Sequence, residues 1–134
     1  MDKKKTTQRH SYNPDQMEQW LQDYFLDPRT EAEDHSIFKI DIYETEKHWI
    51  VEAVLKDYLS SEIKVRIENF ILIITAQKHR TSLPAPIYKK ERKIYFPFQI
   101  IDHCVTALFQ NGVVEIFISK TDDGLGKNRY VTLP

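Results

Sequence analysis

Three neighbouring residues, Asp102, His103 and Cys104, bring an acid, a base and a nucleophile together in the sequence. A thiol next to an imidazole becomes a nucleophile when the ring can take its proton. Residues 103–109 read as an extended segment, in which neighbouring side chains point to opposite faces, so His103 could not reach Cys104. A lone cysteine is more often a small buried hydrophobe. We therefore expect no catalytic residue here, and a protein that is not an enzyme.

The sequence also offers little support for a metal site, a disulfide or a phosphate-binding loop. The remaining histidines are scattered, with no pair at ligand spacing: His10, His35, His48 and His79. A single cysteine excludes an intramolecular disulfide and a multi-cysteine zinc site. The only glycines are Gly112, Gly124 and Gly126, which excludes glycine-rich phosphate loops of the Walker and Rossmann types. We expect no metal and no cofactor.

The composition describes one modest domain. The chain has 134 residues, 41% hydrophobic and 29% charged, with a formal net charge of -1. Such a balance creates no global field that would attract nucleic acid or anionic lipid. The longest apolar runs are far shorter than a membrane span, and residues 1–10 lack the apolar region of a secretory signal. These features predict a cytoplasmic protein without a membrane partner.

Residues 1–35 read as an N-terminal arm with one amphipathic helix at about 14–26. Its apolar residues form a single stripe at helical spacing: Met17, Trp20, Leu21, Tyr24 and Phe25. Asn13 suits the N-cap, Pro14 suits the first helical position, and Asp27-Pro28 ends the helix. So short a helix needs a partner surface, and the pattern leaves open whether this is its own domain or another chain. The acidic residues 27–36 that follow predict a linker.

From residue 37 the apolar period changes to two, which predicts strands. They are expected at 37–43, 48–55, 63–68, 70–76, 94–98, 104–109 and 113–119. The strands at 70–76 and 113–119 are apolar on both faces and should be central. Asn111-Gly112 predicts a tight hairpin, and Pro97 marks an edge strand or a strand end. This series predicts an all-β, antiparallel two-sheet sandwich over residues 36–120.

The connection at 77–93 is basic, and its residues 87–92 could form a short extra strand. Its cations make nucleic-acid binding an alternative, but only Tyr88 offers a face for stacking a base. The acidic arm could instead pair with this segment between protomers. Solubility is the simpler explanation, because exposed ion pairs contribute only about 0–1 kcal/mol.

Residues 121–134 form a C-terminal tail with an apolar ending. Val131 and Leu133 would point the same way on an extended segment. Such a pair suits strand addition into a groove at a sheet edge, where burial contributes about 1.5–3 kcal/mol for each side chain. We expect these two residues to anchor an oligomer.

Several of these segments resemble the small heat shock protein family. Residues 107–116 resemble its A-x-x-x-N-G-V-(L/V)-x-(I/V) signature hairpin, through Ala107, Asn111, Gly112, Val113, Val114 and Ile116. Residues 40–45, IDIYET, are similar to the opening of the family's α-crystallin domain, and residues 131–133 resemble its C-terminal I-x-I/V anchor. The family's L-P-G reads Leu55-Lys56-Asp57 here, and the stretch before the Phe-Pro motif is several residues shorter.

The resemblance implies an immunoglobulin-like antiparallel β-sandwich, the α-crystallin domain. It also implies ATP-independent binding, as a holdase chaperone or an assembly factor. The implied partners are a second copy, in a homodimer or larger oligomer, and partly unfolded proteins. These would be held by the apolar stripe of the helix and by the groove that the tail would occupy. In bacterial members of the family the corresponding stretch, which is shorter in this chain, carries a strand exchanged between protomers, so Tyr88, Glu91 and Arg92 are candidates for a dimer loop. The related CS-type co-chaperones usually lack both the hairpin and the terminal motif.

A narrower resemblance concerns the helix. Residues 17–21 and 24–28, just ahead of IDIYET, are similar to the α-crystallin-like coat and germination proteins of endospore-forming bacteria. This implies a spore-coat protein, located in the mother-cell cytoplasm during assembly, with coat proteins as partners and a role in coat assembly or germination. A purely structural oligomeric coat protein without client-holding activity is the alternative.

Overall fold

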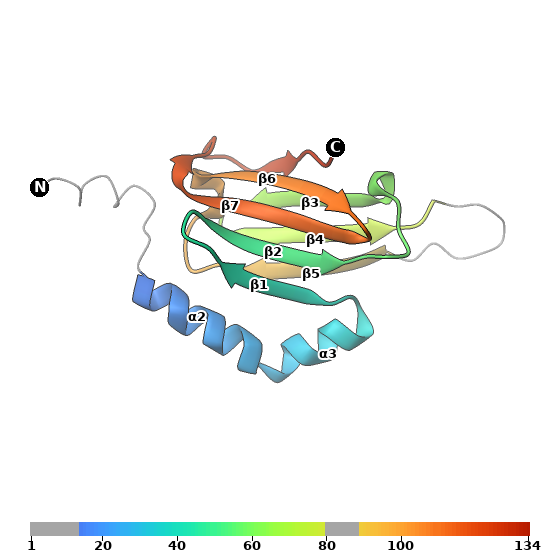
Figure 1. Cartoon of the computed structure of the whole chain (residues 1–134), viewed down its shortest axis with the longest axis horizontal. Coiled ribbons are helices and arrows are strands. Elements are labelled where there is room, and N and C mark those ends of the chain that lie inside the picture. Colours follow the sequence, from blue (N-terminus) through green and yellow to red (C-terminus); the bar gives the residue numbers. More distant parts are fainter. Residues whose placement is uncertain (1–13, 80–88) are drawn as a thin grey trace, which may run out of the picture.

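The computed structural model describes residues 14–79 and 89–134, whose strands form two four-stranded antiparallel sheets (Figure 1). The first, called the β1 sheet, has the order β1-β2-β7-β6, with β1 at Ile40–Glu44, β2 at His48–Val54, β7 at Val113–Asp123 and β6 at His103–Gln110. The second, called the β5 sheet, has the order β5-β4-β3-β8, with β5 at Lys89–Tyr95, β4 at Ile71–Gln77, β3 at Ile63–Glu68 and β8 at Arg129–Val131. The predicted all-β antiparallel sandwich is confirmed.

The core lies between the two sheets, because alternate residues of each strand point inward. Trp49, Val51 and Ala53 of β2 are completely buried. They lie beside Ile116 and Ile118 of β7, their neighbouring strand in the sheet. The strands predicted to be central, β4 and β7, each have a neighbour on both sides, as expected.

The hairpin between β6 and β7 follows from its two turn residues. Gln110 pairs with Val113, and both Asn111 (φ 54°) and Gly112 (φ 77°) are left-handed. A two-residue turn of this kind requires positive φ at both positions, which Asn-Gly tolerates best. Space also selects glycine here, since a Cβ on Gly112 would lie 2.7 Å from Cγ of Lys56.

The fifth strand differs from the prediction at 94–98. β5 spans Lys89–Tyr95, so most of it comes from the basic connection, and it replaces both the expected strand and the short extra one. Pro97 behaves as predicted, because β5 is an edge strand and ends before it. Phe96 and Phe98 remain buried although they lie beyond the strand.

Two helices precede the sheets. The predicted helix is present as α2 (Pro14–Leu26), while Asn13, its expected N-cap, lies outside the described residues. The linker prediction was wrong for residues 28–36, which form helix α3 (Pro28–Ser36). Asp27 caps α3, because its side chain accepts a hydrogen bond from the backbone N–H of Arg29. The sequence lacked an apolar stripe here, yet the cap and tertiary contacts stabilise a helix.

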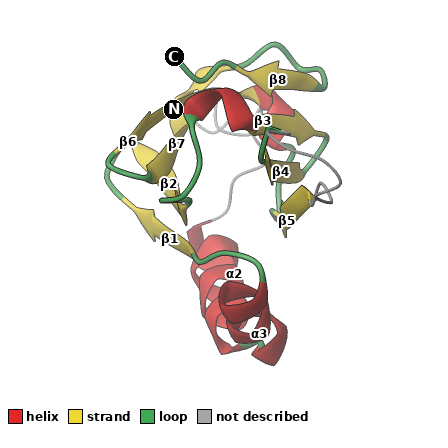
Figure 2. Cartoon of the chain, turned by 90° about the vertical axis from the view of Figure 1, so that its right-hand side faces the viewer, coloured by secondary structure: helices red, strands yellow, loops and turns green. Residues whose placement is uncertain are grey.

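Short 3₁₀ turns at Ser60–Glu62 (η1) and Ile100–Asp102 (η2) lead into β3 and β6. Viewed along the strands, the sandwich has two edges at which its sheets face each other, and each edge is covered by another part of the chain (Figure 2). α2 and α3 lie at the edge where β1 and β5 face each other, which we call the helix edge. β8 lies at the opposite edge, between β3 and β6, which we call the tail edge.

Candidate functional site: the two closed edges of the sandwich

At the helix edge, the apolar stripe of α2 docks on its own domain. Met17 is 1% exposed and belongs to the core. The Trp20 ring stacks on Phe96 with centroids 5.0 Å apart, and its Nε1 donates a hydrogen bond to the Tyr95 carbonyl at 2.8 Å. The question left open by the sequence is thereby answered in favour of the chain's own surface.

This docking corrects most of the predicted client surface. Met17 is buried, and three of the other stripe residues are partly buried against the core: Trp20, Leu21 and Tyr24. Only Phe25 of the five predicted residues is substantially exposed, at 47%. The aromatic stripe was recognised correctly as a buried face, but its occupant is the sandwich.

Arg92 lies in the interior of the helix edge. Its side chain is 1% exposed, and Nη1 donates to Asp34 Oδ1 at 2.7 Å and to the Phe38 carbonyl at 2.6 Å. Its Nε also lies 3.3 Å from Glu33 Oε1. Alternate residues of β5 point inward, so a charged residue in this register needs counter-charges inside the protein. The prediction of Arg92 in a dimer loop, or on a nucleic-acid surface, was therefore wrong.

Tyr24 connects the two helices to this buried arginine. Arg92 Nη2 lies 3.3 Å from the Tyr24 hydroxyl, and the Thr30 hydroxyl donates to the Tyr24 carbonyl at 2.7 Å. Burial, opposed in part by Arg92, raises the pKa of Tyr24 to about 12. Tyr24 thus remains neutral at ordinary pH and serves as a structural link between α2, α3 and β5.

Tyr88 and Glu91 are the other two candidates for a dimer loop. Tyr88 lies outside the described residues. Glu91 lies on the outer face of the β5 sheet, where its Oε2 accepts from the Thr75 hydroxyl at 3.3 Å. Participation of Glu91 in a protomer contact remains a prediction.

At the tail edge, the C-terminal residues add a strand to the chain's own sheet. β8 pairs antiparallel with β3, through Val131 with Val65 and Arg129 with Ile67. Val131 is 8% exposed and Leu133 packs partly buried against the core. A cavity of about 330 Å³ adjoins both residues at this edge. The predicted strand addition is therefore present within one chain, while anchoring of a second copy remains a prediction.

Arg129 fastens the tail to β6. Its Nη2 donates to the His103 carbonyl at 2.9 Å and its Nη1 to the Ile101 carbonyl at 3.1 Å. The chain approaches β6 most closely at Gly124, where a Cβ would lie 2.1 Å from the His103 carbonyl oxygen. Sequence reasoning missed both residues, although a glycine between two strands is a recognisable signal of close backbone approach.

The residues of the signature hairpin form structure rather than a binding surface. Ala107, Val114 and Ile116 are buried in the core, and Val113 is half-buried. Asn111 and Gly112 make the turn. The signature therefore specifies the pairing of the edge strand β6 with the central strand β7.

The candidate base His103 and the candidate nucleophile Cys104 lie at the start of β6. His103 is completely buried, with Nδ1 2.8 Å from the Ser119 carbonyl and its ring 4.8 Å from that of Phe98. Cys104 is half-buried and unpaired in any disulfide. Among residues 14–79 and 89–134, no group of three or more histidine, cysteine or acidic residues could hold a metal ion. No helix in that part of the chain is long and apolar enough to cross a membrane.

This chain is similar in sequence to known proteins. No family model matches the chain. Spore coat protein M of Bacillus subtilis (strain 168) is 25% identical over 111 residues, which cover 82% of this chain and 78% of that protein. Small heat shock protein C2 of Rickettsia felis is 30% identical over 102 residues, which cover 69% of this chain and 66% of that protein.

Solved structures agree on the fold. The hspA protein from Xanthomonas axonopodis matches with a TM-score of 0.50 at 23% identity, covering 64% of this chain and 95% of that one. Heat shock protein 16.0 from Schizosaccharomyces pombe matches with a TM-score of 0.50 at 18% identity, covering 68% and 93%. Sequence similarity, the signature hairpin and the two-sheet topology agree: this chain belongs to the small heat shock protein (α-crystallin) family.

Proposed function

We propose that this protein is an ATP-independent holdase or assembly factor that binds extended apolar segments of other polypeptides, in the assembly or germination function of a spore coat. The observation that carries the proposal is the tail edge, where an exposed strand edge is covered only by a three-residue strand. Similarity to Spore coat protein M supports the coat setting. Location in the mother-cell cytoplasm during assembly is part of the proposal, and so is self-association.

The tail edge has the features of a strand-addition site. When β8 leaves, β3 presents unpaired backbone groups, and the sites of Val131 and Leu133 become apolar depressions two residues apart. Burial of one such side chain contributes about 1.5–3 kcal/mol, most of which is opposed by the ordering of the tail. The tail is therefore displaceable by an apolar segment with the same spacing. Repetition around an oligomer would raise the effective concentration of such weak sites.

The test is suppression of aggregation of a heated model protein without ATP. We expect the full chain to suppress aggregation. At a dilution where the wild type is also dissociated into small species, the Val131→Glu/Leu133→Glu variant should suppress it more strongly per chain, because its groove is no longer occupied. Leu125→Glu is the matched control, since Leu125 lies in the tail region but is 70% exposed. Equal aggregation with and without the wild-type chain, together with no gain in the double variant, would reject client holding.

The second candidate is a purely structural coat component. It is favoured by the helix edge, where most of the aromatic stripe is already covered by the chain's own sandwich. This candidate predicts incorporation into the coat of sporulating cells with no suppression of aggregation. Fractionation of spores and the heating assay, performed on the same wild-type and variant chains, separate the two candidates.

A further inference from the structure

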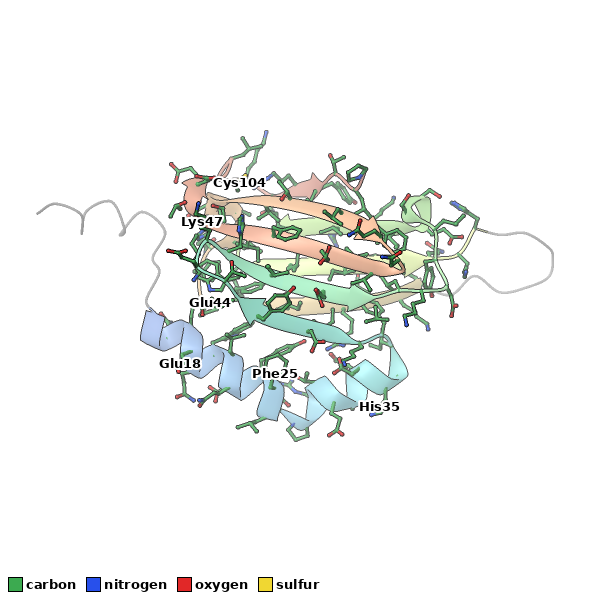
Figure 3. All side chains as sticks on the ribbon, in the orientation of Figure 1. Glu18, Phe25, His35, Glu44, Lys47 and Cys104 are labelled. Carbon is green, nitrogen blue, oxygen red and sulfur yellow. The ribbon has the colours of Figure 1, made fainter. Side chains whose placement is uncertain are left out.

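The outer face of the β1 sheet carries a row of negative charge. Asp41, Glu52 and Glu115 are direct cross-strand partners on β1, β2 and β7. They point outward, since the adjacent residues in the register are core residues. None of the paired residues of this sheet is a lysine or an arginine. We call this surface, which faces the viewer in Figure 3, the acidic face.

Like charges directly opposite each other on neighbouring strands are destabilising, so the acidic row needs an explanation. Within the chain its compensation is small: Lys39 Nζ lies 3.8 Å from Asp41 Oδ2, and the Tyr43 hydroxyl donates to Glu52 Oε2 at 2.8 Å. That hydrogen bond, with burial and the nearby carboxylates, raises the pKa of Tyr43 to about 12. Tyr43 itself is 41% exposed beside the row, so the surface is accessible.

The outer face of the β5 sheet has the opposite character. Lys64 and Arg66 of β3 share this face with Lys89 and Lys93 of β5, because their register partners on β4 lie in the same rows. Arg66 is paired with Glu68, whereas Glu91 accepts only from the neutral Thr75 hydroxyl and keeps its charge, so the four basic residues face two acids. A hollow of about 560 Å³ opens here, and its lining includes four basic residues, Lys64, Arg66, Lys78 and Lys89, and two carboxylates, Glu62 and Glu91. We call this surface the basic face.

We propose that copies of this chain stack head to tail, with the acidic face of one copy on the basic face of the next. The two faces lie on opposite sides of one sandwich, so each copy offers one of each. Stacking of two identical faces would bring like charges together, which charge complementarity disfavours. A head-to-tail contact that does not close into a ring generates an open linear stack of molecules. Such stacks, side by side, could form a layer.

The contact is expected to be weak on its own. A sheet of four strands, about 4.8 Å apart and about six residues long, presents roughly 19 by 20 Å, which is small for a stable interface. Association should therefore rise with protein concentration and fall with salt. The inference does not depend on client holding at the tail edge, because neither face includes Val131 or Leu133.

A charge-swap experiment tests the proposal. One variant reverses the acidic face (Glu52→Lys/Glu115→Lys), a second reverses the basic face (Lys64→Glu/Lys89→Glu), and a third carries all four changes. The weight-average mass is measured by light scattering over a range of protein concentrations. Measurements use about 20 mM and about 500 mM salt, between which the Debye length falls from about 20 Å to about 4 Å.

We expect the wild-type mass to increase with concentration at low salt and to lose this increase at high salt. By itself, each two-residue variant should show no salt-sensitive increase in mass. A mixture of the two variants should show this increase again, and so should the four-residue variant. Recovery in the mixture also shows that the variants are folded. Glu18→Lys/Glu31→Lys, which reverses two exposed charges on the helices, is the matched control and should behave as the wild type. A wild-type mass insensitive to salt, or no recovery in the mixture, would overturn the proposal.

Discussion

The helix edge and the tail edge close the same core by different physical means. At the helix edge a buried methionine, stacked rings and an arginine with 1% side-chain exposure connect α2 and α3 to β5. At the tail edge the C-terminal residues are held by a three-residue strand, two apolar side chains and hydrogen bonds from Arg129. One edge is part of the core, whereas the other resembles a bound peptide that happens to belong to the same chain. This difference is the reason why the proposed exchange with partners is assigned to the tail edge.

The largest effect is expected from Asp34→Ala at the helix edge. This change removes the 2.7 Å partner of the buried Arg92 and leaves the half-exposed Glu33 as its remaining counter-charge, so the cost should approach but not exceed that of a fully broken buried pair, about 3–5 kcal/mol. Denaturant unfolding measures the free energy of unfolding. Glu31→Ala, an exposed position on the same helix, should change it by less than about 0.5 kcal/mol. Equal stability of Asp34→Ala and the wild type would show that the helix edge is not integral to the core.

The second largest loss of stability is expected from Met17→Ala, also at the helix edge. Met17 is 1% exposed, and truncating a buried methionine to alanine costs about 2–5 kcal/mol through lost burial and the cavity left behind. The control is Leu26→Ala, which alters the same helix at a side chain that is 79% exposed. If both variants unfolded at the same denaturant concentration as the wild type, α2 would not be docked in solution.

Substitutions at the tail edge should change the native mass of the assembly more than the free energy of unfolding. Val131→Glu with Leu133→Glu removes burial of about 1.5–3 kcal/mol per side chain and should reduce large assemblies to small ones, with the sandwich still folded. Light scattering after size exclusion measures the native mass, best at high salt, where face stacking is screened. A chain lacking residues 128–134 should behave likewise, and Leu125→Glu should not. An unchanged mass would mean that the tail anchors only its own chain.

The smallest effect concerns alkaline pH. Burial raises the pKa of Tyr24 to about 12, above that of an unfolded tyrosine near 10. Stability from this group is therefore fully present below about pH 10 and is lost as the pH rises toward 12. Tyr24→Phe should unfold with a weaker pH dependence between pH 10 and 12, and tail variants should retain the wild-type slope. Parallel pH curves for wild type and Tyr24→Phe would contradict the buried position of this hydroxyl.

Local patterns predicted the parts of the molecule that depend on local physics. Asn111-Gly112 specifies its turn through backbone conformation alone, and the apolar runs identified β4 and β7 as central strands. Helix α3 escaped prediction because its main partner, Arg92, lies 58 residues from Asp34 in the sequence. A pattern that shows a buried face does not show what covers it.

The same limitation explains the two edges and the two charged faces. The spacing of Val131 and Leu133 predicted a docked strand, but spacing carries no information on whether the groove belongs to the same chain. Asp41, Glu52 and Glu115 form a row only after the strand register is known, because they come from three separate strands. For the basic connection the sequence predicted a short extra strand at 87–92, and its pairing with β4 shows one strand, Lys89–Tyr95, that continues past this range.

The lysines of β5 have a consequence for behaviour at high concentration. An edge strand is a template on which other chains can add strands, the first step toward cross-β fibrils. Lys89, Lys90 and Lys93 place positive charge along this margin. In a fibril with a spacing of about 4.8 Å, each added copy would bring identical ammonium groups into register, which is unfavourable. The chain can therefore be packed densely with a reduced tendency to form amyloid.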